Sequence, residues 1–118
     1  MKKFMVLVKA CETAGPPPQA FLDAMGKAAE SARRDGTLLD TGGLAPSAQG
    51  ARIRLAAGKL TIHDGPFSEA KEVVGGFGVV RADTKEAALE GVVRMMQLHR
   101  DLWPGWEGET EVREIVDR

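Results

Sequence analysis

The sequence predicts an α+β domain with an antiparallel sheet, and three observations support this fold class. Two segments carry apolar residues at helical spacing, and the segments around them show the alternation of β-strands. Their order along the chain is strand, helix, strand, two short strands, strand, helix, strand. A chain of 118 residues suits one domain, so we expect residues 1–118 to form a single unit.

The first strand is expected at residues 3–10, where apolar side chains fall on both faces. Phe4 and Val6 should point to one side of the sheet, and Met5 and Leu7 to the other. A strand that is apolar on both faces is typical of the centre of a sheet covered on both sides.

An amphipathic helix is predicted from Gln19, with Phe21 beginning its apolar face. Asp35-Gly36 is expected to end this helix. A short strand should follow at residues 37–41, closed by Gly42-Gly43 and then by a loop at 44–50.

The alternating pattern of residues 51–63 predicts a β-hairpin with one polar face. Its first strand alternates Arg52 and Arg54 with Ile53 and Leu55, and Ala57-Gly58 makes the turn into a second alternating strand.

The remaining elements are a glycine-rich strand at 73–82, a second helix and a last strand at 109–116. Asp83 as N-cap and Glu86 three residues later read as a capping box, and the helix should run to about His99. Its buried side is expected to carry Ala88, Val92, Met95 and Met96.

This order of elements predicts a ferredoxin-like β-α-β-β-α-β domain with a β-hairpin insertion and both helices on one face of the sheet. The opposite face then needs a cover, because large exposed apolar patches are rare in monomers. A second copy of the chain is the simplest cover, so we expect a two-fold homodimer.

Composition excludes several classes of function. With 16 Lys and Arg against 17 Asp and Glu, the chain has no basic excess for nucleic acid. One cysteine, Cys11, and two histidines give no internal disulfide and a weak case for a metal site, so we expect no metal and no cofactor. No apolar run is long enough for a membrane span or a signal peptide, which predicts a cytoplasmic protein.

The segment from His63 to Glu72 is the most informative for function, because titratable side chains crowd around a stiff Gly-Pro turn. His63 or Asp64 is the candidate catalytic base, and Lys71 could stabilise a developing negative charge. The alternative is structural: Asp64 caps the turn and the other charged residues form a solvated rim. The candidate substrate-binding residues are Phe67, Glu69, Glu72, His99 and Trp103.

His99 and Trp103 also have structural interpretations. His99 lies at the expected C-terminal end of a helix, where the helix dipole favours a cation. Trp103 and Trp106 should cover a sheet edge or the subunit boundary, and the alternative is an aromatic wall for a ligand.

Asp64 to Glu72, followed by Gly75-Gly76-Phe77, resembles the YCII-related family in its DGPF-motif branch. The likeness implies a ferredoxin-like subunit that forms a dimeric α+β barrel. Some members of the wider family resemble small cofactor-free enzymes that use a His-Asp pair, with the histidine near the first helix. The helix expected here from Gln19 has no histidine, so that pair does not transfer to this chain.

Two functional hypotheses follow. The first is a cofactor-independent enzyme that moves protons on a small organic acid or aromatic compound, as a lyase, isomerase or dehydrohalogenase does. The second is a non-catalytic dimer that binds a small molecule or a regulatory protein. A cofactor-free monooxygenase on the same barrel is a further alternative.

Overall fold

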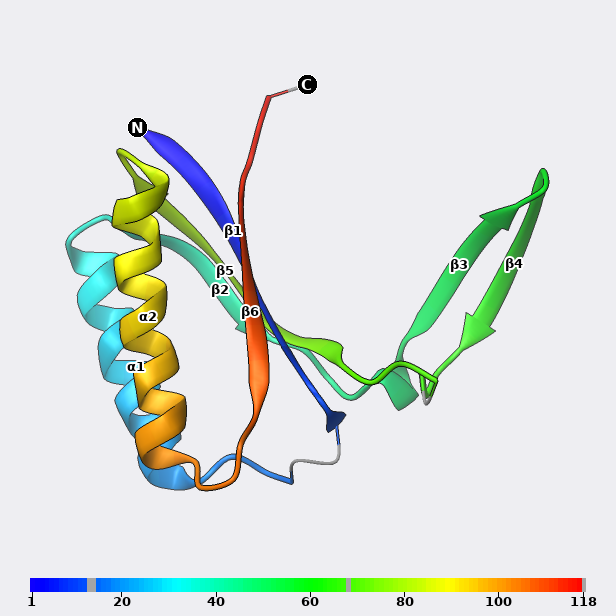
Figure 1. Ribbon diagram of the computed structural model, residues 1–118, viewed down its shortest axis with the longest axis horizontal. Helices are drawn as coiled ribbons and strands as arrows, with labels where there is room; N and C mark the ends of the chain where they lie inside the picture. Colours follow the sequence, from blue (N-terminus) through cyan, green and yellow to red (C-terminus); the bar gives the residue numbers. More distant parts are fainter. Residues whose placement is uncertain (13–14, 68, 118) are drawn as a thin grey trace.

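The computed structural model describes residues 1–12, 15–67 and 69–117, which form an α+β fold with a projecting hairpin (Figure 1). The strands are β1 (Lys2–Ala10), β2 (Leu38–Gly43), β3 (Ala51–Ala56), β4 (Lys59–Asp64), β5 (Val73–Ala82) and β6 (Gly108–Glu114). The helices are α1 (Gln19–Arg34) and α2 (Lys85–Leu102), and a short 3-10 helix spans Ser47–Gln49.

Four strands form one antiparallel sheet in the order β2-β5-β1-β6. The strand that is apolar on both faces, β1, is therefore central, as the sequence predicts. Both helices lie on one face of this sheet (Figure 1), and with β3 and β4 set aside the strand order is that of a ferredoxin-like domain.

The core lies between the sheet and the helices. Phe4 and Val6 of β1 are buried there against a layer that includes Phe21 of α1 and Ala88 of α2. Helix α1 ends as predicted, because Asp35 closes it and Gly36 has a positive φ of 82°, a conformation that glycine adopts without strain.

The N-cap prediction for α2 is wrong by one residue. The side chain of Thr84, not Asp83, accepts a hydrogen bond from the backbone N–H of Ala87. With Thr84 as N-cap the third helical residue is Ala87, so Glu86 cannot complete a capping box. The helix also continues past His99 to Leu102.

No helix of the described residues lies on the opposite face of the sheet. Met5 and Leu7 of β1 lie beside Val79 and Phe77 of β5 on this open face, and all four side chains are half-buried. The ring of Phe77 lies over Gly42 of β2, where a Cβ atom would come within 2.9 Å of it.

Strands β3 and β4 form a separate two-stranded sheet, which we call the arm (Ala51–Asp64). The arm projects from the body on the side of the sheet opposite the helices (Figure 1). Every residue of both strands is exposed, and neither strand packs extensively on another element. Within the described residues, neither helix is long and apolar enough to cross a membrane.

Candidate functional site

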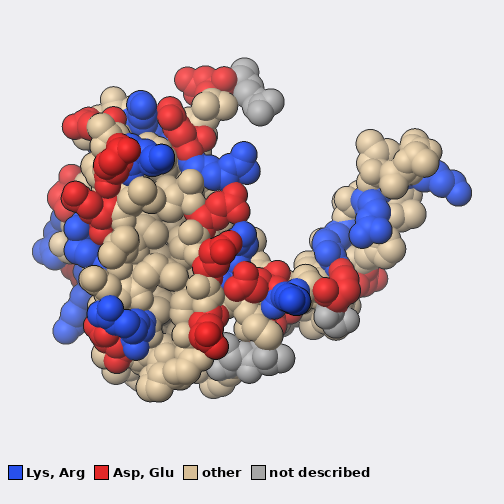
Figure 2. Space-filling model, viewed as in Figure 1, with Lys and Arg blue, Asp and Glu red and all other residues tan. Residues whose placement is uncertain are grey.

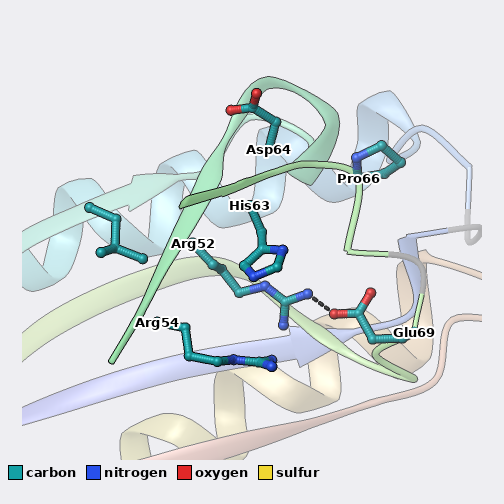
Figure 3. Close-up of a pocket in the computed structure, with 7 residues that line it drawn as sticks. Arg52, Arg54, His63, Asp64, Pro66 and Glu69 are labelled. Carbon is teal, nitrogen blue, oxygen red and sulfur yellow. Dashed lines mark ion pairs between the residues drawn. The ribbon is translucent and has the colours of Figure 1, made fainter. Parts of the chain in front are cut away.

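The arm has one polar and one apolar face. Its register places Arg52 opposite His63 and Arg54 opposite Thr61, so these side chains share the polar face. The apolar face consists of the opposed pairs Ile53–Ile62 and Leu55–Leu60. Because neighbouring residues of a strand point to opposite faces, His63 and Asp64 point apart (Figure 3).

The turn after β4 is anchored to the loop that contains Ser47. Gly65 approaches this loop so closely that a Cβ atom on it would overlap the Ser47 carbonyl oxygen. The backbone N–H of Gly65 donates to the carbonyl of Gly50 at 2.8 Å, and the N–H of Phe67 donates to Ser47 Oγ at 3.1 Å. The packing of this turn therefore explains the Gly-Pro-Phe sequence on its own, without a catalytic role for the turn.

Ser47 also contacts a third segment through Glu12. The Glu12 carboxylate accepts hydrogen bonds from the backbone N–H of Ser47 at 2.6 Å and from its hydroxyl. These bonds, the hydroxyl bond foremost, stabilise the ionised carboxylate and lower the pKa of Glu12. Ser47 is buried, and it joins the end of β1, its own loop and the turn at the base of the arm.

Arg52 is held across the base of the arm by two contacts. Its guanidinium lies 4.1 Å from the centre of the Phe67 ring and forms an ion pair with Glu69. Arg54, two residues further along the same face, makes no ion pair or hydrogen bond within the described part of the chain. The Arg54 side chain is exposed on this face.

These side chains line a groove of about 610 Å³ at the base of the arm (Figure 3), a volume in the range of small-molecule sites. The lining residues are Arg52, Ile53, Arg54, His63, Asp64, Pro66 and Glu69. All of them are exposed, so the groove is open to solvent. The lining carries two guanidinium groups, an imidazole and two carboxylates; the Glu69 carboxylate is paired with Arg52, and that of Asp64 points away from His63. An anionic ligand on the polar face would therefore meet Arg54 first.

The structure brings some of the predicted site residues together and separates others. His63 and Glu69 line the groove, and Phe67 lies beneath Arg52. Asp64 borders the groove from the apolar side of the arm, pointing away from His63. Lys71 and Glu72 are exposed and lie outside the lining of the groove.

His99 and Trp103 lie elsewhere, in an aromatic cluster at the C-terminal end of α2. The His99 ring is 4.6 Å from the ring of Phe21 and 4.4 Å from that of Trp106, and Trp103 lies 5.1 Å from Phe21. Neither His99 nor Trp103 lines the groove. The cluster fixes the start of α1 against the end of α2 and the loop before β6.

The interpretation of His99 as a charged helix cap is not supported by its surroundings. Its side chain is only 5% exposed, and its Nδ1 donates to the backbone carbonyl of Met95 at 3.0 Å. Burial lowers the pKa of His99, against a smaller opposing effect of the hydrogen bond to Met95. The buried imidazole is therefore stabilised in its neutral form.

The sequence predicts Arg52 and Arg54 on one face but indicates no function for them, for Glu12 or for Ser47. The alternation of arginines with Ile53 and Leu55 places the two arginines on one face but contains no signal for the groove beside them. The contact between Glu12 and Ser47 spans 35 residues and has no local signal. Among the described residues, no group of three or more His, Cys, Asp and Glu side chains could hold a metal ion.

Comparison with known proteins gives a family but no characterised relative. The model of the YCII-related domain matches residues 2–95, which include the core sheet strands β1, β2 and β5, the arm, α1 and most of α2. A search of curated proteins finds no match. Because the match covers well over half of the chain, this protein belongs to the YCII-related domain family.

Proposed function

We propose that this protein is a homodimer that binds a small organic acid in the groove at the base of the arm. The observation that carries the proposal is the convergence of Arg52, Arg54 and His63 on one groove of about 610 Å³. Arginine presents paired N–H donors that match a carboxylate. Ile53 and Pro66 in the same lining give the carbon skeleton of such a ligand an apolar contact.

The homodimer is supported by the open sheet face. Met5, Leu7, Phe77 and Val79 would become buried if a second copy of the sheet packed on this face. The turn from Asp64 to Phe67 further supports placing the chain in the DGPF branch of its family.

Binding is tested by calorimetric titration with benzoate, a small carboxylate with an apolar ring. Arg54→Gln should weaken benzoate binding about 10-fold or more, because it removes a charge-assisted hydrogen bond. Lys59→Gln is the matched control: it removes the same charge from the same face of the arm, outside the groove. Equal affinities of the two variants would refute the groove as the binding site.

Proton transfer by His63 is a second candidate function. His63 lies on the same face as both arginines, and its Nε2 is 3.2 Å from Thr61 Oγ1. The His63 imidazole would take up the proton, and Arg54 would stabilise the charge of an enolate, the role the sequence suggested for Lys71.

This candidate is tested by incubating the protein with pyruvate in D₂O and following deuterium entry at the methyl group. A rate above background that disappears in His63→Gln supports catalysis. If the unaltered protein shows only the background rate but binds benzoate, it is a binding protein without this activity.

A further inference from the structure

The two arginines of the groove differ in what they contact. Arg52 stacks on the Phe67 ring and forms an ion pair with Glu69, whereas the Arg54 side chain makes no ion pair or hydrogen bond among the described residues. Glu69 reaches Arg52 from outside the arm, because it follows the turn after β4 (Figure 3). One guanidinium of the groove is therefore paired with a carboxylate of the protein itself, and the other is unpaired within the described part of the chain.

We propose that the ligand of the groove is a dicarboxylic acid, and that Glu69 occupies the position of its second carboxylate until the ligand binds. The inference rests on the proposed function, because it names the class of small organic acid that the groove takes. It makes Glu69 the residue that sets the preference between acids with one carboxylate and acids with two.

The first observation is the spacing of the two arginines. Arg52 and Arg54 lie two residues apart on the same face of β3, so their Cα atoms are about 6.6 Å apart at the usual rise of a strand. Extended adipate, a six-carbon diacid, separates its two carboxyl carbons by about 6 Å, given C–C bonds of about 1.5 Å. A ligand of this length can place one carboxylate at each arginine.

The second observation is the surroundings of Arg52. The strand register sets His63 opposite Arg52, and both residues line the groove. A carboxylate that displaces Glu69 would therefore lie between a guanidinium and an imidazole. Because Arg52 also stacks on Phe67, its guanidinium has a contact that persists while one carboxylate replaces another.

The third observation is the exposure of the ion pair between Arg52 and Glu69. The side chain of Arg52 is 42% exposed and that of Glu69 is 63% exposed. Ion pairs in such positions contribute little to stability, because both charges remain solvated and the pair restricts two long side chains. A ligand carboxylate can therefore replace Glu69 without unfolding the turn.

Glu69 discriminates between ligands because it is attached to the chain. A tethered carboxylate faces Arg52 at an effective concentration on the order of millimolar, which a dissolved monocarboxylate must exceed. A monocarboxylate therefore binds Arg54, where no carboxylate of the protein competes. Once one carboxylate of a diacid lies on Arg54, its second carboxylate is tethered as well and can compete with Glu69.

The test compares adipate with hexanoate by calorimetric titration at fixed ionic strength. Both ligands have six carbon atoms, and adipate carries a carboxylate where hexanoate ends in a methyl group. The unaltered protein should bind adipate about 3-fold or more tightly than hexanoate, because the second carboxylate gains Arg52 only by displacing Glu69. Lys59→Gln, which removes a positive charge from the same face outside the groove, should leave the ratio of the two affinities unchanged.

The decisive variant is Glu69→Gln, which removes the competing charge and keeps the size of the side chain. The preference for adipate over hexanoate should increase by about 10-fold or more in this variant. Glu72→Gln is the matched control, because it removes the same charge from the same segment outside the groove lining. An equal preference for adipate in Glu69→Gln and the unaltered protein would overturn the proposal.

Arg52→Gln tests the second carboxylate position itself. Without this guanidinium, the affinities for adipate and hexanoate should lie within about 2-fold of each other, because both ligands then use Arg54 alone. A preference for adipate that survives in Arg52→Gln would place its second carboxylate elsewhere and would overturn the proposal.

The unaltered protein provides a readout that does not depend on a variant folding. The ¹³C signal of the Glu69 side-chain carboxylate should shift on saturation with adipate, as this carboxylate leaves Arg52, and should remain in place with hexanoate. A Glu69 signal that does not move with adipate bound would contradict the displacement.

Two outcomes separate this inference from the proposed function. If benzoate, hexanoate and adipate all fail to bind, the proposed function is refuted and this inference with it. If benzoate and hexanoate bind through Arg54 but adipate binds no more tightly than hexanoate, the groove takes monocarboxylates and only this inference is refuted.

Discussion

Ser47 connects segments that are far apart in the sequence. Its hydroxyl donates to the Glu12 carboxylate and accepts from the N–H of Phe67, while its carbonyl oxygen lies against Gly65. One buried hydroxyl thus holds the end of β1 and the base of the arm together. The candidate site depends on this residue although Ser47 does not line the groove.

Ser47→Ala should therefore lower the free energy of unfolding by about 1–3 kcal/mol, because the N–H of Phe67 loses its acceptor in a partly buried place. Urea denaturation measures the loss. Ser31→Ala, on the exposed surface of α1, is the control and should leave stability unchanged or slightly raised. Equal effects of the two substitutions would show that the Ser47 network contributes nothing.

The buried imidazole of His99 makes stability depend on pH. Because burial lowers the pKa of His99, the unfolded chain binds the proton more readily than the folded chain. The contribution of His99 to stability is complete at pH values above 6.5, the ordinary pKa of histidine, and is lost as the pH falls below that value. Urea midpoints should therefore fall on acidification from pH about 7.5 to 5.

The variant His99→Gln lacks the buried imidazole, so its midpoint should change less over the same interval. Glu12 titrates only at lower pH, because its own pKa is lowered by Ser47. Parallel pH profiles for the two proteins would show that His99 is not the titrating group.

At the scale of single elements, the arm and its turn form one unit. The turn is fixed where Gly65 passes the carbonyl of Ser47, and Arg52 is then held between Phe67 and Glu69. The orientation of the groove therefore follows from a backbone contact rather than from the titratable residues themselves.

Gly65→Ala should displace this turn, since its Cβ atom would overlap the Ser47 carbonyl oxygen. Overlaps of this kind cost about 1–3 kcal/mol or more, and benzoate affinity should fall at least 10-fold as the groove loses its shape. Gly75→Ala is the control, because nothing lies within 4 Å of that Cβ position. Normal benzoate binding by Gly65→Ala would contradict this role of the turn.

The elements themselves could be predicted from the sequence because alternation and helical spacing are local. Strand β5 was predicted with its observed bounds, Val73–Ala82, and the polar face of the arm followed from the spacing of Arg52 and Arg54. The N-cap of α2 was misplaced because Asp83 and Thr84 are both good caps and the choice depends on backbone geometry.

The site was harder to predict because its geometry comes from distant contacts. A run of titratable residues from His63 to Glu72 suggested one cluster, yet strand alternation turns Asp64 away from His63. Lys71 and Glu72 follow a turn whose path is set by Ser47, and no local pattern contains that information. The burial of His99 likewise depends on Phe21, in the other helix.

At the scale of the whole molecule, one chain leaves two apolar surfaces uncovered. The open sheet face and the arm lie on the same side of the molecule, and both helices lie on the other (Figure 1). The homodimer proposed above would cover the open sheet face, whose apolar side chains are half-buried in one chain.

The most direct test of the central proposal, that the groove binds a small organic acid, is an NMR titration of the ¹⁵N-labelled protein with benzoate. Saturable shifts should be concentrated on Arg52, Arg54 and His63, with the signals of the aromatic cluster around His99 unmoved. Shifts centred on His99 and Trp103, or no saturable shifts, would contradict it.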